Sequence, residues 1–293
     1  MRDTNKKLYI FVTTLLVLSL FSIAIFGIKV LYMLIAAILS GAVFEVAFAL
    51  VKKEKMNYIE WLVTPILFVM FLPVTVPIWL VISGTIFAVL FGKLLFGGAG
   101  KYVFSPALVG ILFVTISFLP LMNNADFTAN LLKAGSSIGT YKDLLLGNTN
   151  GMVGETFRLL IIGLGVVLIL YKVIDWKIPF FYILSFFLIT YLAKAFGMQG
   201  VSDPLDSLFV GTLMLGAFFA ATDEATIAKY PIGRVIYAVG LGFFTFLIRT
   251  MSAYPEGVVF AIIIMNMLAP LIDKIEEPRK RISEPKVISE ELI

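Results

Sequence analysis

The feature that most constrains this chain is a series of long apolar runs. Residues 8–28 contain no charged side chain, and a helix needs about 20 such residues to cross a bilayer. Of the 293 residues, 60% are hydrophobic and 14% are charged. Soluble domains are about 45–50% apolar and about 25% charged. We therefore expect an integral membrane protein, and no small-residue cleavage site after residue 28 indicates a removable signal peptide.

The runs predict an all-α fold of about ten transmembrane helices. Two of them are too short or too interrupted for a simple span: residues 61–72 contain Pro65 and end at Pro73, and residues 208–221 run into Asp223. These two are third in each set of five. The layout is typical of two inverted five-helix repeats, in which Lys93 aligns with Arg249. The other predicted segments are residues 8–28, 30–51, 78–96, 102–121, 159–171, 178–192, 235–248 and 257–272.

The distribution of lysine and arginine among the loops predicts on which side of the membrane the two termini lie. With ten crossings and a cytoplasmic amino terminus, most of the 23 lysines and arginines fall on the cytoplasmic side, as the positive-inside rule requires. We expect a multi-pass protein of the cell (inner) membrane with both termini cytoplasmic. Its parts are a first membrane half (1–121), an outer hydrophilic loop (122–155), a second membrane half (156–273) and a cytoplasmic tail (274–293).

The absence of two residue types excludes several chemistries. The chain has no Cys and no His, which rules out thiolate ligation of iron–sulfur clusters, histidine-ligated haem and imidazole-based catalysis by its own side chains. If the protein handles electrons, it must therefore carry them on an organic cofactor or pass them to metal centres in partner chains. The weak positive charge of +4 gives no case for nucleic-acid binding.

Two glycine-rich stretches are candidate anion sites. Between Lys93 and Lys101, glycines allow the backbone to approach a ligand closely, although a flexible inner loop explains the same residues. Gly151 and Gly154 precede a predicted helix, whose free N–H groups suit a phosphate or carboxylate. Alternatively, Glu155 satisfies these groups within the chain.

Acidic residues at membrane depth are the candidates for an ion pathway. A carboxylate in hydrocarbon is costly and needs a partner, a proton or a water-filled cavity. Glu45 lies inside an apolar segment, Asp223 ends the second broken segment, and Glu256 lies at an outer turn. Alternatively, Asp223 is a water-exposed loop residue, and Glu256 lies in the first turn of the next helix, where it complements the helix dipole. Arg249, against the positive-inside trend, is a further candidate for contact with an anion on the outer face.

Several motifs in register resemble the NqrB/RnfD family, and the chain is more similar to its RnfD branch. They cover residues 91–101, 104–110, 143–155, 215–223 and 254–257, with Asn266. The resemblance implies ten helices in two inverted halves. It also implies a flavoprotein component, not catalytic alone, of an ion-translocating ferredoxin:NAD⁺ oxidoreductase (the Rnf complex) that couples electron transport to Na⁺ or H⁺ transport. The implied partners are the A, B, C, E and G subunits of the Rnf complex, together with membrane lipid.

The resemblance also implies FMN joined through its phosphate to a threonine on the outer side. The residue in register is Thr128, but Asp126 and Phe127 stand where the family has small residues; Thr140 matches the pattern better but is out of register. Covalent attachment at either residue and no covalent flavin all stay open. A second, non-covalent flavin such as riboflavin is a family feature as well. The alternative functions are a small-solute channel or secondary transporter with inverted repeats, and a scaffold without covalent flavin.

Overall fold

A computed structural model describes residues 2–53, 59–123, 151–155, 157–252 and 257–283. Its described residues are helical, apart from connecting segments and one isolated bridge between Pro73 and Met152. The first group of helices is α1 (Arg2–Phe26), α2 (Ile28–Lys52), η1 (Glu60–Leu62), α3 (Val63–Met70), α4 (Ile78–Gly92), η2 (Leu94–Phe96), α5 (Pro106–Ser117) and α6 (Leu119–Asn123). The second group is α9 (Arg158–Leu170), α10 (Lys177–Ala195), α11 (Pro204–Phe209), α12 (Leu213–Leu215), η3 (Gly216–Ala220), α13 (Pro231–Met251) and α14 (Val258–Ser283).

Within this described part, six helices are long and apolar enough to cross a membrane: Asn5–Phe26, Ile28–Lys52, Ile78–Phe96, Lys177–Ala195, Pro231–Met251 and Val258–Glu276. Three shorter apolar helices, Glu60–Met70, Pro106–Ser117 and Arg158–Leu170, lie among them. The prediction of an all-α, multi-pass membrane protein is thus confirmed.

Local sequence explains where the helices begin and end. Gly27 has a φ of 80°, which favours glycine, and it separates α1 from α2. Pro106 occupies the first turn of α5, so this helix starts later than the predicted residue 102. Conversely, α14 continues to Ser283, beyond the predicted boundary at residue 273.

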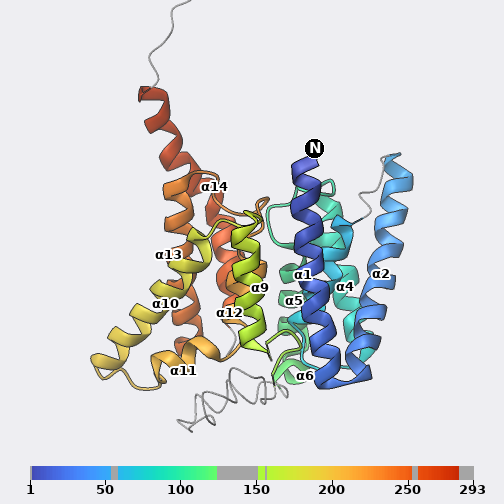
Figure 1. Ribbon diagram of the computed structural model, residues 1–293, viewed down its shortest axis with the longest axis horizontal. Helices are drawn as coiled ribbons and strands as arrows, with labels where there is room; N and C mark the ends of the chain where they lie inside the picture. Colours follow the sequence, from blue (N-terminus) through green and yellow to red (C-terminus); the bar gives the residue numbers. More distant parts are fainter. Residues whose placement is uncertain (1, 54–58, 124–150, 156, 253–256, 284–293) are drawn as a thin grey trace, which may run out of the picture.

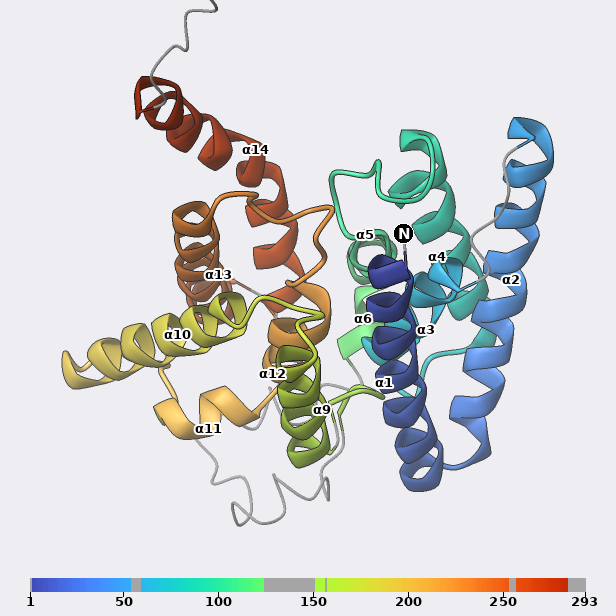
Figure 2. The same ribbon diagram turned by 45° about the horizontal axis from the view of Figure 1, so that its top comes forward.

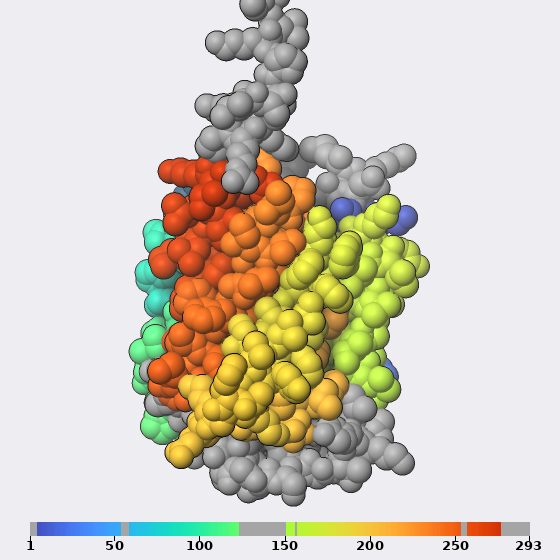
Figure 3. Space-filling model, turned by 90° about the vertical axis from the view of Figure 1, so that its left-hand side faces the viewer, coloured from blue at the N-terminus to red at the C-terminus, as the bar shows by residue number. Residues whose placement is uncertain are grey.

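The two groups of helices lie side by side in both ribbon views (Figure 1 and Figure 2), the first coloured blue to green and the second yellow-green to red. In the first group α2 packs against α4 and α4 against α5; in the second, α10 packs against α13 and α13 against α14. Figure 3 shows α10, α13 and α14 forming one continuous outer face. The start of α1 and the end of α14 lie at the same end of the bundle, which we call the N-terminal end (Figure 1).

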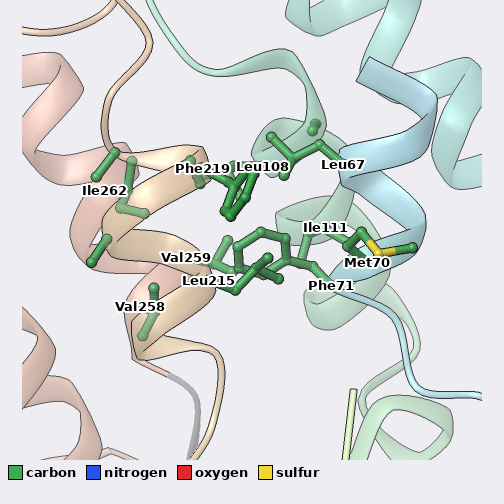
Figure 4. Packing of buried hydrophobic residues seen from close by; sticks show 14 of the residues in the cluster. Leu67, Met70, Phe71, Leu108, Ile111, Leu215, Phe219, Val258, Val259 and Ile262 are labelled. Carbon is green, nitrogen blue, oxygen red and sulfur yellow. The ribbon is translucent and has the colours of Figure 1, made fainter. Parts of the chain in front are cut away.

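The core between the groups is apolar. Leu67, Met70 and Phe71 of the α3 region, with Leu108 and Ile111 of α5, face a second set of buried side chains, namely Leu215, Phe219, Val258, Val259 and Ile262 (Figure 4). The short helices α3 and α12 therefore run through the middle of the molecule, away from lipid.

Both short segments leave backbone groups that helical hydrogen bonds do not satisfy, and other parts of the chain satisfy them. After α3, the carbonyls of Met70 and Leu72 accept hydrogen bonds from the N–H groups of Gly154 (2.8 Å) and Val153 (2.9 Å). The second segment is interrupted at residues 210–212, where Gly211 has a φ of 75°. Non-helical backbone at membrane depth is tolerated only when protein or water covers it, and here protein does so.

Candidate functional site

A cavity of about 560 Å³ lies between the two groups of helices at the N-terminal end. Small-molecule sites typically measure about 300–1,000 Å³ and combine apolar walls with a few polar groups. This cavity has that character: its lining includes Phe11, Leu67, Pro106, Ile174 and Phe219, together with Glu60, Thr64, Tyr102, Thr222 and Asp223. It can therefore enclose a small ligand whose polar atoms are recognised at a small number of places.

Asp223 and Tyr102 join the two sides of this cavity. Asp223 follows η3 in the second group, and its Oδ1 accepts a hydrogen bond from the N–H of Ala225 at 3.0 Å. The hydroxyl of Tyr102, from the loop before α5, donates to the same carboxylate. Asp223 was predicted from sequence as a functional acid, but Tyr102 was not, because only the fold brings residues 102 and 223 together.

Glu45 has the partner that a buried carboxylate requires. Lys93, the residue after α4, places its Nζ 2.7 Å from Glu45 Oε1 and 3.4 Å from Glu60 Oε1. The side chain of Lys93 is only 2% exposed. Buried charges are normally paired in this way, because desolvation of an isolated ion is costly. Lys93 thus contacts carboxylates of its own chain, and Glu60 connects this cluster to the cavity.

Lys101 differs from Lys93. Its side chain is exposed, and it follows Gly97, Gly98 and Gly100, all of which have positive φ. The glycines therefore serve the turn itself. Gly100 lines the cavity, so Lys101 lies next to its rim.

The stretch around Gly151 and Gly154 holds a carboxylate supplied by the chain itself. Glu155 accepts hydrogen bonds from the N–H groups of Met152 (3.2 Å) and Gly211 (2.8 Å) and from Arg158 Nη2 (2.8 Å). A Cβ on Gly154 would lie 2.8 Å from that of Met70, so this glycine permits close packing. These contacts match the alternative in which Glu155 satisfies the turn internally.

Arg249 binds carbonyl groups of the second broken segment. Its guanidinium donates to the backbone oxygens of Ser207 (2.8 Å) and Val210 (3.1 Å) and lies over the ring of Phe186, 5.2 Å from its centroid. A cation at the end of α11 also complements the helix dipole. The other predicted site residues, Thr128, Thr140 and Glu256, lie outside the described residues.

Among the residues that the structure describes, no group of three or more His, Cys, Asp or Glu side chains is arranged to hold a metal ion.

Comparisons with known proteins agree with the motifs. The model of the NQR2, RnfD, RnfE family matches residues 1–281. The chain is 32% identical over 290 residues to the D subunit of the proton-translocating ferredoxin:NAD(+) oxidoreductase complex of Clostridium ljungdahlii, covering 89% of this chain and 87% of that protein. It is 31% identical over 272 residues to the D subunit of the Na(+)-translocating ferredoxin:NAD(+) oxidoreductase complex of Acetobacterium woodii, covering 87% and 83%. It is 33% identical over 257 residues to the B subunit of the Na(+)-translocating NADH-quinone reductase of Pseudomonas paraeruginosa, covering 80% and 63%.

Proposed function

This chain belongs to the NQR2, RnfD, RnfE family, and from that premise we propose that it is the D subunit of an Rnf-type ion-translocating ferredoxin:NAD⁺ oxidoreductase. It acts in electron and ion transport as part of a complex and is not catalytic alone; its partners are the A, B, C, E and G subunits. Relatives of nearly equal identity are named for protons and for Na⁺, so the proposal covers either ion.

We propose further that the membrane region has ten helices in two inverted five-helix halves. In this arrangement α1–α5 correspond to α9, α10, the α11–η3 segment, α13 and α14. The matching packing of α2, α4 and α5 with that of α10, α13 and α14 supports it, as do the short third members. The positive-inside rule then makes the N-terminal end of the bundle cytoplasmic.

The cavity is the proposed site of a non-covalent flavin such as riboflavin. Its volume of about 560 Å³ and its apolar walls suit a three-ring isoalloxazine, which supplies one- and two-electron redox chemistry when bound. Tyr102, Asp223 and Thr64 would hold its polar edge, while Phe11, Leu67 and Phe219 exclude water from its faces. An FMN on the outer side would be attached at Thr128 or, less in register, at Thr140.

Ion handling falls to the carboxylates Glu45, Asp223 and Glu256. Asp223 faces the cavity, so a change of charge on a ligand there alters the affinity of its carboxylate for a proton or cation. Glu45 is paired with Lys93, whose Nζ lies 2.7 Å from Glu45 Oε1. The same ammonium also contacts Glu60, and Glu60 lines the cavity.

One observation carries this proposal: a family match over residues 1–281 coincides with a cavity that presents an acid of the matched motif, Asp223. The test begins with the visible spectrum of the purified complex and of this chain alone, in which a bound flavin gives its absorbance band. Fluorescence on a denaturing gel reports covalent flavin. Mass spectrometry of Thr128→Val and Thr140→Val proteins then identifies the attachment site, each variant serving as the control for the other.

Ion transport is tested in vesicles that contain the complex. Glu45→Gln and Asp223→Asn are expected to lower redox-driven ion uptake, and uptake unchanged in both would contradict the assignment. Solute flux without flavin would favour the channel or transporter reading. Stable assembly with partners but no flavin would favour the scaffold reading.

A further inference from the structure

Two loops, together with Phe219 of η3, form the wall that the second group of helices contributes to the cavity. Val173 and Ile174 come from the connection between α9 and α10, and residues 222–225 follow η3. Neither loop is a continuation of a rigid helix across the cavity. Asp223 belongs to the second of these loops, so a contact that holds both loops together would restrict the shape of the site.

Arg234, in the first turn of α13, makes such a contact. Its Nη1 lies 2.9 Å from Asp175 Oδ2, beside Val173 and Ile174, and its Nη2 lies 2.8 Å from Glu224 Oε2, beside Asp223. Its Nε donates to the carbonyl of Ala228 at 3.2 Å. The planar guanidinium therefore uses all three of its nitrogens, each on a different residue at the N-terminal end of the bundle. The single ammonium of a lysine cannot make all three contacts in this geometry.

The start of α13, from which Arg234 projects, is held in place by α14. Asp273 Oδ1 accepts a hydrogen bond from the N–H of Lys229, and Glu276 Oε2 accepts one from the N–H of Gly233, both at 2.8 Å. Acceptors at the start of α13 satisfy its free N–H groups and complement its dipole. Arg234 thus projects from a fixed helix end, and the two loops take their position from it.

We propose that Arg234 is a positioning residue for the cavity: by holding Asp175 and Glu224 together, it fixes the two loops that place Asp223 opposite Tyr102. Arg234 is not among the residues that line the cavity. The role in flavin binding rests on the proposed function, whereas the effect on the loops stands without it.

The absence of cysteine from the chain permits a direct test. Cysteines introduced at Trp176, which is exposed beside Asp175, and at Ala225, beside Glu224, carry spin labels in the full chain reconstituted in lipid nanodiscs. The label-to-label distance distribution is then measured by pulsed electron spin resonance. We expect one narrow peak with Arg234 and loss of that peak with Arg234→Gln. Lys229→Gln is the matched control, because it removes an exposed positive charge from the same loop, and it should keep the narrow peak.

Arg234→Lys separates charge from geometry. It keeps the charge but reaches one carboxylate at a time, so we expect only partial recovery of the peak. If Arg234→Gln does not fold, the double variant Asp175→Asn/Glu224→Gln removes both partners and is expected to lose the peak as well. An unchanged narrow peak in Arg234→Gln, or in the double variant, overturns the proposal.

Flavin absorbance is measured on unlabelled protein, because Ala225 lines the cavity and a label there would occupy the proposed flavin site, and it keeps the two proposals apart. If the peak is lost but the parent chain carries no flavin, Arg234 positions the loops and the flavin proposal fails. If the parent chain carries flavin and the peak is unchanged, the positioning role fails and the flavin proposal stands.

Discussion

Lys93 and Arg249 take matching positions at opposite ends of the bundle. Each is the basic residue at the end of a helix that packs against two others of its group, α4 against α2 and α5, and α13 against α10 and α14. Lys93 contacts Glu45 on α2 and Glu60 just before α3; Arg249 contacts the ring of Phe186 on α10 and carbonyls at the end of α11. A basic residue at the end of the matching helix therefore contacts neighbouring helices in both groups. Lys93 forms an ion cluster at the N-terminal end of the bundle, whereas Arg249 binds backbone carbonyls at the opposite end. Both features support the inverted-halves proposal.

The first prediction concerns the buried ammonium. Lys93→Met removes the counter-ion of Glu45 and leaves a carboxylate in a site that is almost closed to water. Loss of one member of a buried ion pair typically costs about 3–5 kcal/mol. We expect a clear fall in the thermal midpoint of the chain in detergent, followed by tryptophan fluorescence. Lys101→Met, which changes an exposed lysine of the same region, should leave the midpoint unchanged; an equal fall in both would show that the pairing is not the cause.

The second prediction compares two glycines. An alanine Cβ at Gly154 would lie 2.8 Å from the Cβ of Met70 and 2.9 Å from a methyl group of Leu215, so packing must shift. Overpacking of this kind costs about 1–3 kcal/mol. At Gly163, on an exposed face of α9, no atom lies within 4 Å of the added Cβ, and alanine favours a helix over glycine by about 1 kcal/mol. Thermal midpoints in detergent should therefore fall for Gly154→Ala and stay level or rise for Gly163→Ala.

The third prediction is a pH dependence of stability that arises from Asp175, at the N-terminal end of the bundle. Burial works to raise the pKa of Asp175, but its hydrogen bond with Arg234, backed by the Lys177 N–H and both positive charges, holds that pKa below its ordinary value. A carboxyl with a lowered pKa in the folded chain stabilises it above the unfolded pKa, about 3.9, and loses that contribution as pH falls through the folded pKa. The thermal midpoint of Asp175→Asn should thus lie below that of the parent at neutral pH, and the two should converge below about pH 4. A constant gap down to about pH 3 would contradict this account.

The sequence predicted the helices well because apolar run length is a local property. What the sequence did not predict were contacts between residues far apart in the chain, which depend on the tertiary structure. A buried Glu45 was expected to need a partner, but Lys93 was read as an anion site, since nothing in the sequence shows that the end of α4 faces α2. Likewise, nothing in the sequence indicates that Arg234 pairs with both Asp175 and Glu224, because these residues come together only in the fold.

Glycine motifs show the same limit. Glycine permits close approach, but the sequence does not say what approaches. At Gly154 the neighbour is Met70 of α3, and beside Gly151 it is the carboxylate of Glu155. In both cases the chain itself fills the space in which a ligand phosphate was one of the expected occupants.

The last prediction tests the contact across the cavity. Tyr102→Phe keeps the ring but removes the hydroxyl that donates to Asp223, a polar link between the two walls of the described cavity. Without that donor the Asp223 carboxylate is less well stabilised in its charged form, so it should bind a proton more readily and exchange it less easily. We expect redox-driven ion uptake by vesicles containing the complex to fall several-fold and its pH optimum to rise, while the amount of assembled complex stays constant. Tyr171→Phe, which changes an exposed tyrosine at the end of α9, is the matched control. Uptake and pH optimum that are identical in the two variants would show that the Tyr102–Asp223 contact has no part in ion transfer.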